Sequence, residues 1–323
     1  MVQAIRIHKT GGPEVLTWEN VAVDAPPPGA VRLRQTAVGL NFIDIYFRSG
    51  LYPATLPLIP GQAAAGVVEA IGDGVSDLKV GDRVAYAGVA GSYAEARIIP
   101  AKNLVPLPAT IDDRQAAASL LQGMTAQYLL CSTYRVQPGE TIVVHAAAGG
   151  VGLILCQWAR KLGVTTIGIV STDEKAEIAR QHGCTHAVVS TREDWVARVR
   201  EITDGAGVPV VYDSVGKATF TGSLDCLKPR GLMVCFGNAS GAVDGFNLGI
   251  LASKGSLYVT RPTLTTYTAS RAELLASAAA FFDVVESGDV RLEVNQSFAL
   301  RDAADAHRAL ESRKTTGSTV LVP

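Results

Sequence analysis

The chain has few cysteines, almost no net charge and no long apolar run. Its five cysteines are scattered among 323 residues, and no two of them form a C-x-x-C pair. An odd, scattered set argues against a disulfide scaffold and favours a reducing compartment, so we expect a cytoplasmic protein. The formal net charge is −1, without clusters of Lys and Arg. We therefore expect neither a nucleic-acid-binding nor a membrane-binding surface.

Apolar residues are abundant but dispersed. Hydrophobic residues make up 48% of the chain and charged residues 18%, as is typical of a soluble globular protein. No apolar run reaches the roughly 18 residues that a transmembrane helix needs. Residues 1–14 lack the apolar core of a signal peptide, so we expect none. The length favours two domains over a single core.

The most informative segment is HAAAGGVG, which begins at His145. It follows an apolar, strand-like run at 141–144 and precedes a helix-like pattern at 153–162. A strand, a glycine-rich turn and a helix present backbone N–H groups and a positive helix end to a pyrophosphate. The usual G-x-G-x-x-G spacing reads A-x-G-x-x-G here, starting at Ala147. The segment predicts a dinucleotide-binding turn.

The remaining patterns divide the chain into two parts. Residues 1–124 favour strands, and from residue 125 strands alternate with helices as in a doubly wound parallel sheet. In this second part we expect strands at 141–145, 165–170, 186–190, 208–213, 231–236 and 256–260. Elements expected to return to the first domain are a helix at 272–286, a strand at 296–300, a helix at 302–313 and a strand at 318–322.

The end of the second expected strand indicates which dinucleotide binds. NAD enzymes of this fold place an acidic residue there for the ribose 2′-hydroxyl, but this strand ends at Ser171. Ser171 and Thr172 can donate hydrogen bonds to a phosphate, and Lys175 adds a cation. Asp173 and Glu174 weaken this interpretation, although both also suit the first turn of the next helix. We predict NADPH rather than NADH.

Nine segments together resemble a known family. Over its whole length the chain resembles the zinc-independent quinone oxidoreductases of the medium-chain dehydrogenase/reductase superfamily, the group that includes zeta-crystallin. It is most similar to the bacterial NADPH:quinone reductases. The segments are GGPEVL at 11–16, GLNFIDIY at 39–46, RSGLY at 48–52, GDRV at 81–84, AAAS at 116–119, HAAAGGVG at 145–152, VYDSVG at 211–216, LMVCFGNASG at 232–241 and KGSLYVTRP at 254–262.

The resemblance implies an α/β fold with a GroES-like β-rich domain and a Rossmann doubly wound parallel sheet. Residues 1–124 and 266–323 would form the substrate domain and 125–265 the dinucleotide-binding domain, with nicotinamide and quinone in a cleft between them. The family pattern implies cofactor contacts from Asn41, Thr125, Gly149, Gly150, Val151, Ser171, Lys175, Phe236, Asn238 and Arg313.

Tyr46 and Tyr52 match tyrosines that line the family's substrate site, so they are the candidate catalytic residues. Quinone reduction needs a hydrogen-bond donor to the developing quinol oxygen, and a tyrosine hydroxyl with a pKa of about 10 donates without ionising. The alternative is that both tyrosines only pack beside the pocket. We expect the stretch 41–52 to be loop-like. Within it, Asn41 and Asp44 are candidates to bind the ribose and nicotinamide groups, and for Asp44 the alternatives are to cap a short helix or to pair with Arg48.

The chain departs from the family pattern at two places. Ser190 or Thr191 stands where relatives often have a tyrosine near the 2′-phosphate, which leaves more of the phosphate binding to Lys175. Gln62 stands where many relatives have a glutamate.

His145 is expected to be a packed or hydrogen-bonded strand residue. Solvated or capping roles are expected for His182, His186 and His307.

Three functions from two classes are compatible with these patterns. The first is NADPH-dependent quinone reduction, and the second is NADPH-dependent reduction of α,β-unsaturated carbonyls, which uses the same hydride geometry. The third is a non-catalytic, RNA-binding or structural crystallin-like protein, which the near-neutral charge disfavours. The strand at 256–260 alternates without proline or charge, so we expect a sheet edge that pairs with its copy in a homodimer, with Leu257 and Val259 in the interface.

Alcohol dehydrogenases of this architecture hold zinc, but this chain lacks the ligands. No cysteine precedes Cys131, and His8 is the only histidine before it. A catalytic zinc needs three Cys, His or carboxylate ligands, and the four-cysteine structural loop is also missing. We expect no bound metal.

We therefore predict that activity is independent of metal ions. EDTA treatment should leave turnover unchanged, because no ligand set for zinc is available. Elemental analysis should find no stoichiometric zinc. A tightly bound zinc that is lost together with activity would contradict the assignment to the zinc-independent family.

Overall fold

The chain folds into two compact units, and each is described here by itself. The computed structural model describes residues 1–312 and 315–323. One unit contains Met1–Gln122, Thr268–Phe282 and Leu292–Pro323, and the other contains Gly123–Tyr267 and Asp283–Arg291. Two unit boundaries fall inside helices, one in α2 (Asp113–Tyr128) and one in α9 (Arg271–Glu286).

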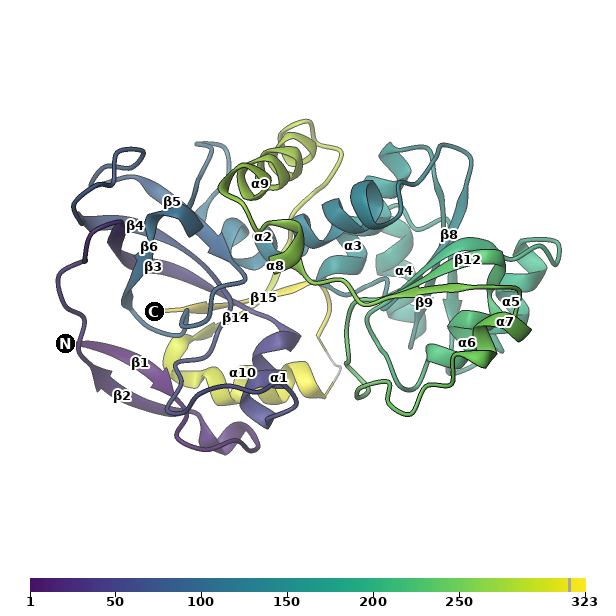
Figure 1. The fold of residues 1–323 in the computed structure, drawn as a ribbon, viewed down its shortest axis with the longest axis horizontal. Coiled ribbons are helices and arrows are strands. Elements are labelled where there is room, and N and C mark those ends of the chain that lie inside the picture. Colours follow the sequence, from purple (N-terminus) through teal and green to yellow (C-terminus); the bar gives the residue numbers. More distant parts are fainter. Residues whose placement is uncertain (313–314) are drawn as a thin grey trace. The chain divides into compact units, whose positions relative to one another are not determined.

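The first unit is built on a mixed sheet in which most neighbouring strands are antiparallel and β14 and β15 are parallel (Figure 1). Its strands follow the order β14-β15-β3-β4-β5-β7, and β6 also pairs with β3, while β1 and β2 form a separate hairpin. Alternate residues of these strands face one core that includes Ile5, Val31, Leu33, Val84 and Ile99. The strands are β1 (Val2–Arg6), β2 (Thr17–Val21), β3 (Ala30–Leu40), β4 (Ala63–Ile71), β5 (Arg83–Ala87), β6 (Ala96–Pro100), β7 (Val105–Pro106), β14 (Val294–Ala299) and β15 (Ser318–Val322).

The second unit is a parallel sheet with the strand order β10-β9-β8-β11-β12-β13. The order turns back at β8, as in a doubly wound Rossmann sheet. Every residue of β11 is buried, because a central parallel strand is covered on both faces. The strands are β8 (Thr141–His145), β9 (Thr165–Val170), β10 (His186–Val189), β11 (Val208–Asp213), β12 (Leu227–Cys235) and β13 (Tyr258–Thr260).

Helices follow the strands of the second unit in regular alternation, so the predicted α/β class is confirmed. The helices are α3 (Gly150–Lys161), α4 (Asp173–Gln181), α5 (Trp195–Ile202), α6 (Phe220–Asp225), α7 (Gly249–Ser253) and α8 (Leu264–Tyr267). In the part of the chain that the structure describes, no helix has both the length and the apolar character to cross a membrane.

The prediction of a loop at 41–52 is wrong, because residues Phe42–Ser49 form helix α1. The Asp44 carboxylate accepts a hydrogen bond from the Asn41 N–H at 2.9 Å, which holds the first turn. Gly50 ends the helix in the left-handed conformation, with φ of +83°. Of the two structural alternatives considered for Asp44, the helix cap and the pair with Arg48, the structure shows the helix cap.

A buried polar network fastens α1 to α10 (Ala303–Glu311) within the first unit. The Arg48 guanidinium forms an ion pair with Glu311 and lies 3.0 Å from Nδ1 of His307. Nε2 of His307 lies 2.9 Å from the Tyr93 hydroxyl, which donates to Asp44 at 3.1 Å. The expectation that His307 is solvated or capping is therefore wrong. Its partners lie more than two hundred residues away, where spacing cannot reveal them.

Burial sets the charge states in this network. Burial, and then the Arg48 charge, lower the pKa of His307 to about 3, so its ring is neutral. Burial raises the pKa of Asp44 to about 7, against the hydrogen bonds from Asn41 and Tyr93. Arg48 and Glu311 are thus the charged pair that ties the helix bearing Tyr46 to the C-terminal part of the unit.

Candidate active site

The glycine-rich turn joins β8 to α3. Ala146 adopts a left-handed conformation with φ of +51°, and its carbonyl accepts a hydrogen bond from the Gly149 N–H at 2.9 Å. A Cβ at Gly152 would lie 2.4 Å from the Ala146 oxygen and 2.7 Å from the Ala147 Cα. Only glycine allows the helix to pack this closely on the turn. The N–H groups of the first helical turn have no acceptor within the helix, so they are available to an anion.

Several predicted cofactor residues meet at the carboxyl edge of the parallel sheet. Gly149 is the N-cap residue of α3, and Gly150 and Val151 begin that helix. Ser171 directly follows β9, while Phe236 and Asn238 follow β12. Since parallel strands end at the same edge, the fold places these residues along one rim.

The turn after β9 contains Ser171 and the start of α4. The Thr172 hydroxyl caps this helix by accepting a hydrogen bond from the Lys175 N–H at 3.3 Å. Lys175 is half-buried in the first helical turn. Asp173 pairs with Arg192, with 3.0 Å between Oδ2 and Nη1. One of the two carboxylates that weakened the prediction of NADPH is therefore paired with a cation that the sequence analysis missed.

Ser190 and Thr191 use their hydroxyls to join the turn after β10 to the turn after β9. The Ser190 hydroxyl donates to the Val170 carbonyl at 3.0 Å, and the Thr191 hydroxyl donates to the Ser171 carbonyl at 2.9 Å. These bonds hold the two strand ends together in the sheet.

The remaining predicted cofactor residues are buried or lie outside the described part. Thr125 is a buried residue of α2 in the second unit. Asn41 is buried in the first unit, and its Oδ1 accepts a hydrogen bond from Gln122 Nε2 at 2.9 Å. Gln122, which the sequence analysis missed, has a buried Oε1 without a hydrogen-bond partner among the described residues. Arg313 lies outside the described residues.

Tyr46 and Tyr52 belong to an aromatic cluster at the end of α1. Their ring centroids are 5.2 Å apart, and the Tyr52 N–H donates to the Tyr46 carbonyl at 3.0 Å. Phe47 contacts the Tyr52 ring edge-on at 5.6 Å. Tyr46 is buried and Tyr52 is half-buried. The contact between their rings shows that the structure brings the two candidate catalytic residues together.

His145 ends β8 with a buried, hydrogen-bonded ring, as expected. Its Nε2 lies 2.9 Å from the Ser223 hydroxyl, which in turn donates to Asp213 at 2.8 Å. Burial lowers the pKa of His145, so the ring is neutral near pH 7. Trp195 packs edge-on against the imidazole. These contacts give His145 a structural role in the second unit.

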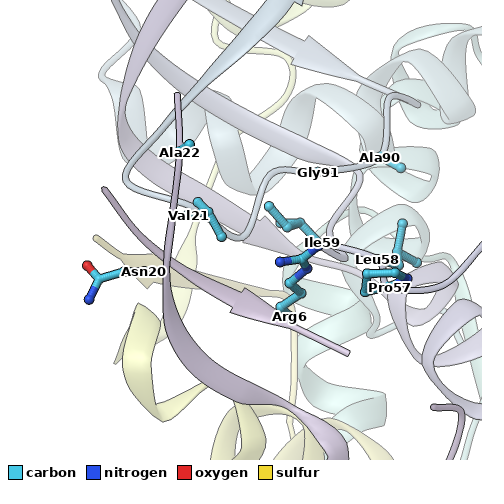
Figure 2. A pocket seen from close by; sticks show the side chains of 9 residues that line it. All are labelled: Arg6, Asn20, Val21, Ala22, Pro57, Leu58, Ile59, Ala90 and Gly91. Atoms are coloured by element: carbon cyan, nitrogen blue, oxygen red, sulfur yellow. The ribbon is translucent and has the colours of Figure 1, made fainter. Parts of the chain in front are cut away.

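A shallow cavity of 590 Å³ lies elsewhere in the first unit (Figure 2). Arg6 and Val21 of the β1–β2 hairpin line it, together with Pro57, Leu58 and Ile59. None of the predicted site residues that the structure describes lines this cavity. Among the described residues there is also no group of three or more His, Cys, Asp or Glu side chains that could hold a metal.

Comparison with known proteins agrees with this arrangement. The family described as "Alcohol dehydrogenase GroES-like domain" matches residues 27–109, which confirms the expected GroES-like domain, and "Zinc-binding dehydrogenase" matches residues 150–278. The chain is 56% identical over 325 residues to a quinone oxidoreductase of Pseudomonas aeruginosa, with 100% of both chains covered. It is 47% identical over 331 residues to a 2-haloacrylate reductase of a Burkholderia species, covering 100% of this chain and 99% of that protein.

A solved structure has the same fold over the whole chain. The Escherichia coli quinone oxidoreductase complexed with NADPH superimposes with a TM-score of 0.98 and 49% identity. The match covers 99% of this chain and 100% of that one.

Proposed function

Because the chain belongs to the zinc-independent quinone oxidoreductases of the medium-chain dehydrogenase/reductase superfamily, we propose that it reduces quinones with NADPH. The observation that carries the proposal is the carboxyl edge of the parallel sheet. There helix α3 packs closely on a glycine-rich turn because position 152 lacks a Cβ. The neighbouring strand ends in serine rather than in an acidic residue. NADPH supplies the hydride when it is bound, and the protein supplies binding and orientation.

The residues at this edge fit a dinucleotide phosphate. We assign the N–H groups of Gly150 and Val151 to the pyrophosphate, since they open α3, and Gly149, the N-cap residue, belongs to the same binding turn. The Ser171 hydroxyl and the Lys175 ammonium are assigned to the 2′-phosphate. Further cofactor contacts are proposed for Asn41, Thr125, Phe236, Asn238 and Arg313.

Domain roles follow from these assignments. We propose residues 125–265 as the dinucleotide-binding domain, and 1–124 with 266–323 as the substrate domain.

We also propose a reducing compartment, the cytoplasm, because all five cysteines are free thiols and four of them are buried.

The binding of NADPH should depend on Lys175. Lys175→Ala should raise the Kd of NADPH by roughly tenfold or more, because it removes a charge-assisted bond of about 1.5–3 kcal/mol. The Kd of NADH should stay the same, since that cofactor lacks the 2′-phosphate. Fluorescence titration measures both constants. Equal loss of affinity for the two cofactors would show that Lys175 does not bind the 2′-phosphate.

Tyr46 and Tyr52 are proposed to donate a hydrogen bond to the developing quinol oxygen. Replacing each by phenylalanine removes the hydroxyl and keeps the ring packing. At least one of the two variants should lower kcat for a quinone by about tenfold or more, with the Kd of NADPH unchanged. If Tyr46→Phe, Tyr52→Phe and the double variant all keep wild-type kcat, the tyrosines serve packing alone.

A second substrate class is favoured by one relative. The relative that is 47% identical over the full chain is a reductase of 2-haloacrylate, as its name states. A 2-haloacrylate has a C=C bond conjugated to its carboxylate, so, like a quinone, it is a substrate that a nicotinamide hydride can reduce. Comparing kcat/KM for 1,4-benzoquinone and 2-chloroacrylate with NADPH decides between the two substrate classes.

The protein is proposed to form a homodimer through β13, which ends the parallel sheet. This short strand exposes Tyr258 at 62%, and an exposed strand edge is normally covered or paired. Pairing across a two-fold axis would join two sheets into one. The expected contribution of the Leu257 side chain needs correction, because Leu257 is buried in the core of the second unit.

Breaking the strand edge should weaken the dimer. Val259→Pro removes a backbone donor from β13 and should raise the dimer dissociation constant by about tenfold or more if that N–H is bonded across the interface. Light scattering at micromolar concentration measures the mass, and thermal unfolding confirms that the variant is folded. A wild-type mass of one chain, or a folded variant that dimerises like the wild type, would contradict the proposed interface.

A further inference from the structure

The turns that follow β9 and β10 are held side by side. The two strands are parallel neighbours with Val170 opposite Val189. The Ser190 N–H donates to the Val170 carbonyl at 2.9 Å, and the Thr191 hydroxyl donates to the Ser171 carbonyl. Residues that follow Thr191 are therefore fixed close to the strand end at which Ser171 lies.

Arg192 is the next residue, and its side chain reaches back to the start of α4. Its Nη1 lies 3.0 Å from Asp173 Oδ2, and its Nη2 lies 4.0 Å from Glu193 Oε1. The Arg192 and Asp173 side chains are 62% and 69% exposed, so the pair contributes little to stability. The pair matters instead for its position, because it lies beside the strand end that carries Ser171.

The charges around this strand end are otherwise unfavourable for a phosphate. Asp173, Glu174 and Glu193 are three carboxylates, against the two cations Lys175 and Arg192. Glu193 accepts a hydrogen bond from the Val189 N–H at 3.0 Å. A hydrogen bond with the Thr172 side chain lowers the pKa of Glu174, which keeps it charged near pH 7. Without Arg192, Asp173 would lose its paired cation and repel a doubly negative group beside Ser171.

We propose that Arg192 is a specificity-determining residue for NADPH. It neutralises Asp173 and brings a second cation to the strand end at which the 2′-phosphate binds, and its planar guanidinium can bond carboxylate and phosphate together. This inference rests on the proposed function, in which Ser171 and Lys175 bind that phosphate. Asp173 stands close to where NAD enzymes keep an acid for the ribose hydroxyl, so the pairing of this carboxylate with Arg192 decides between the two cofactors.

The test is a set of binding titrations with NADPH and NADH in the absence of quinone. Arg192→Ala should weaken NADPH about tenfold and leave the Kd of NADH within about twofold. The double variant Arg192→Ala/Asp173→Asn should recover at least part of the lost NADPH affinity, because the repelling carboxylate is gone. Arg198→Ala is the matched control, since Arg198 forms an exposed ion pair with Glu201 on α5.

The outcomes separate this inference from the proposed function. If Lys175→Ala loses the preference for NADPH but Arg192→Ala keeps it, Arg192 has no role and the proposed phosphate site stands. If Arg192→Ala weakens the binding of NADPH and of NADH equally, the proposal that Arg192 neutralises Asp173 is wrong. It is also wrong if adding Asp173→Asn restores none of the lost affinity for NADPH. If the wild-type protein binds both cofactors equally, the proposed 2′-phosphate site fails, and the role of Arg192 fails with it.

Discussion

The close packing of helix α3 on the end of strand β8 is the constraint on which the dinucleotide site depends. The hydrogen atom of Gly152 fills a space where a Cβ would lie 2.4 Å from the Ala146 carbonyl oxygen. This contact lets the helix start immediately after the turn, with its N-terminal N–H groups at the carboxyl edge of the sheet. A larger residue would have to move backbone atoms, which would shift the helix end away from the strand.

In our account, charge at the neighbouring strand ends then selects the cofactor. Strand β9 ends in Ser171 without an acid, and the hydroxyls of Ser190 and Thr191 hold the next turn against it. Arg192 neutralises the Asp173 carboxylate by forming an ion pair with it. Because the Arg192 side chain is exposed, its guanidinium is also a cation that a phosphate at this edge of the sheet can contact. In our account, the fold positions the dinucleotide, and a few charged side chains at the rim choose between its phosphorylated and unphosphorylated forms.

The parallel sheet was predictable because its strands are nearly continuous apolar runs, which need no partner to be recognised. The resemblance named the candidate residues, and the structure places Gly149, Ser171 and Asn238 along one edge. Helix α1 was predicted as a loop because its apolar, aromatic residues follow no clear helical pattern, although a helix cap at Asp44 was one of the alternatives considered. His307 and Arg192 were missed for a different reason. Each acts through a partner that only the folded chain brings near, across 259 residues for His307 with Arg48 and 19 for Arg192 with Asp173.

The central claim is that the strand end at Ser171 binds a phosphate. It is tested most directly by titrating the wild-type protein with NADPH and with NADH at low and at moderate ionic strength. The account predicts that NADPH binds at least about tenfold more tightly at low salt, and that the difference shrinks as salt screens the exposed charges. Equal dissociation constants at low salt, or a preference for NADH, would contradict the account.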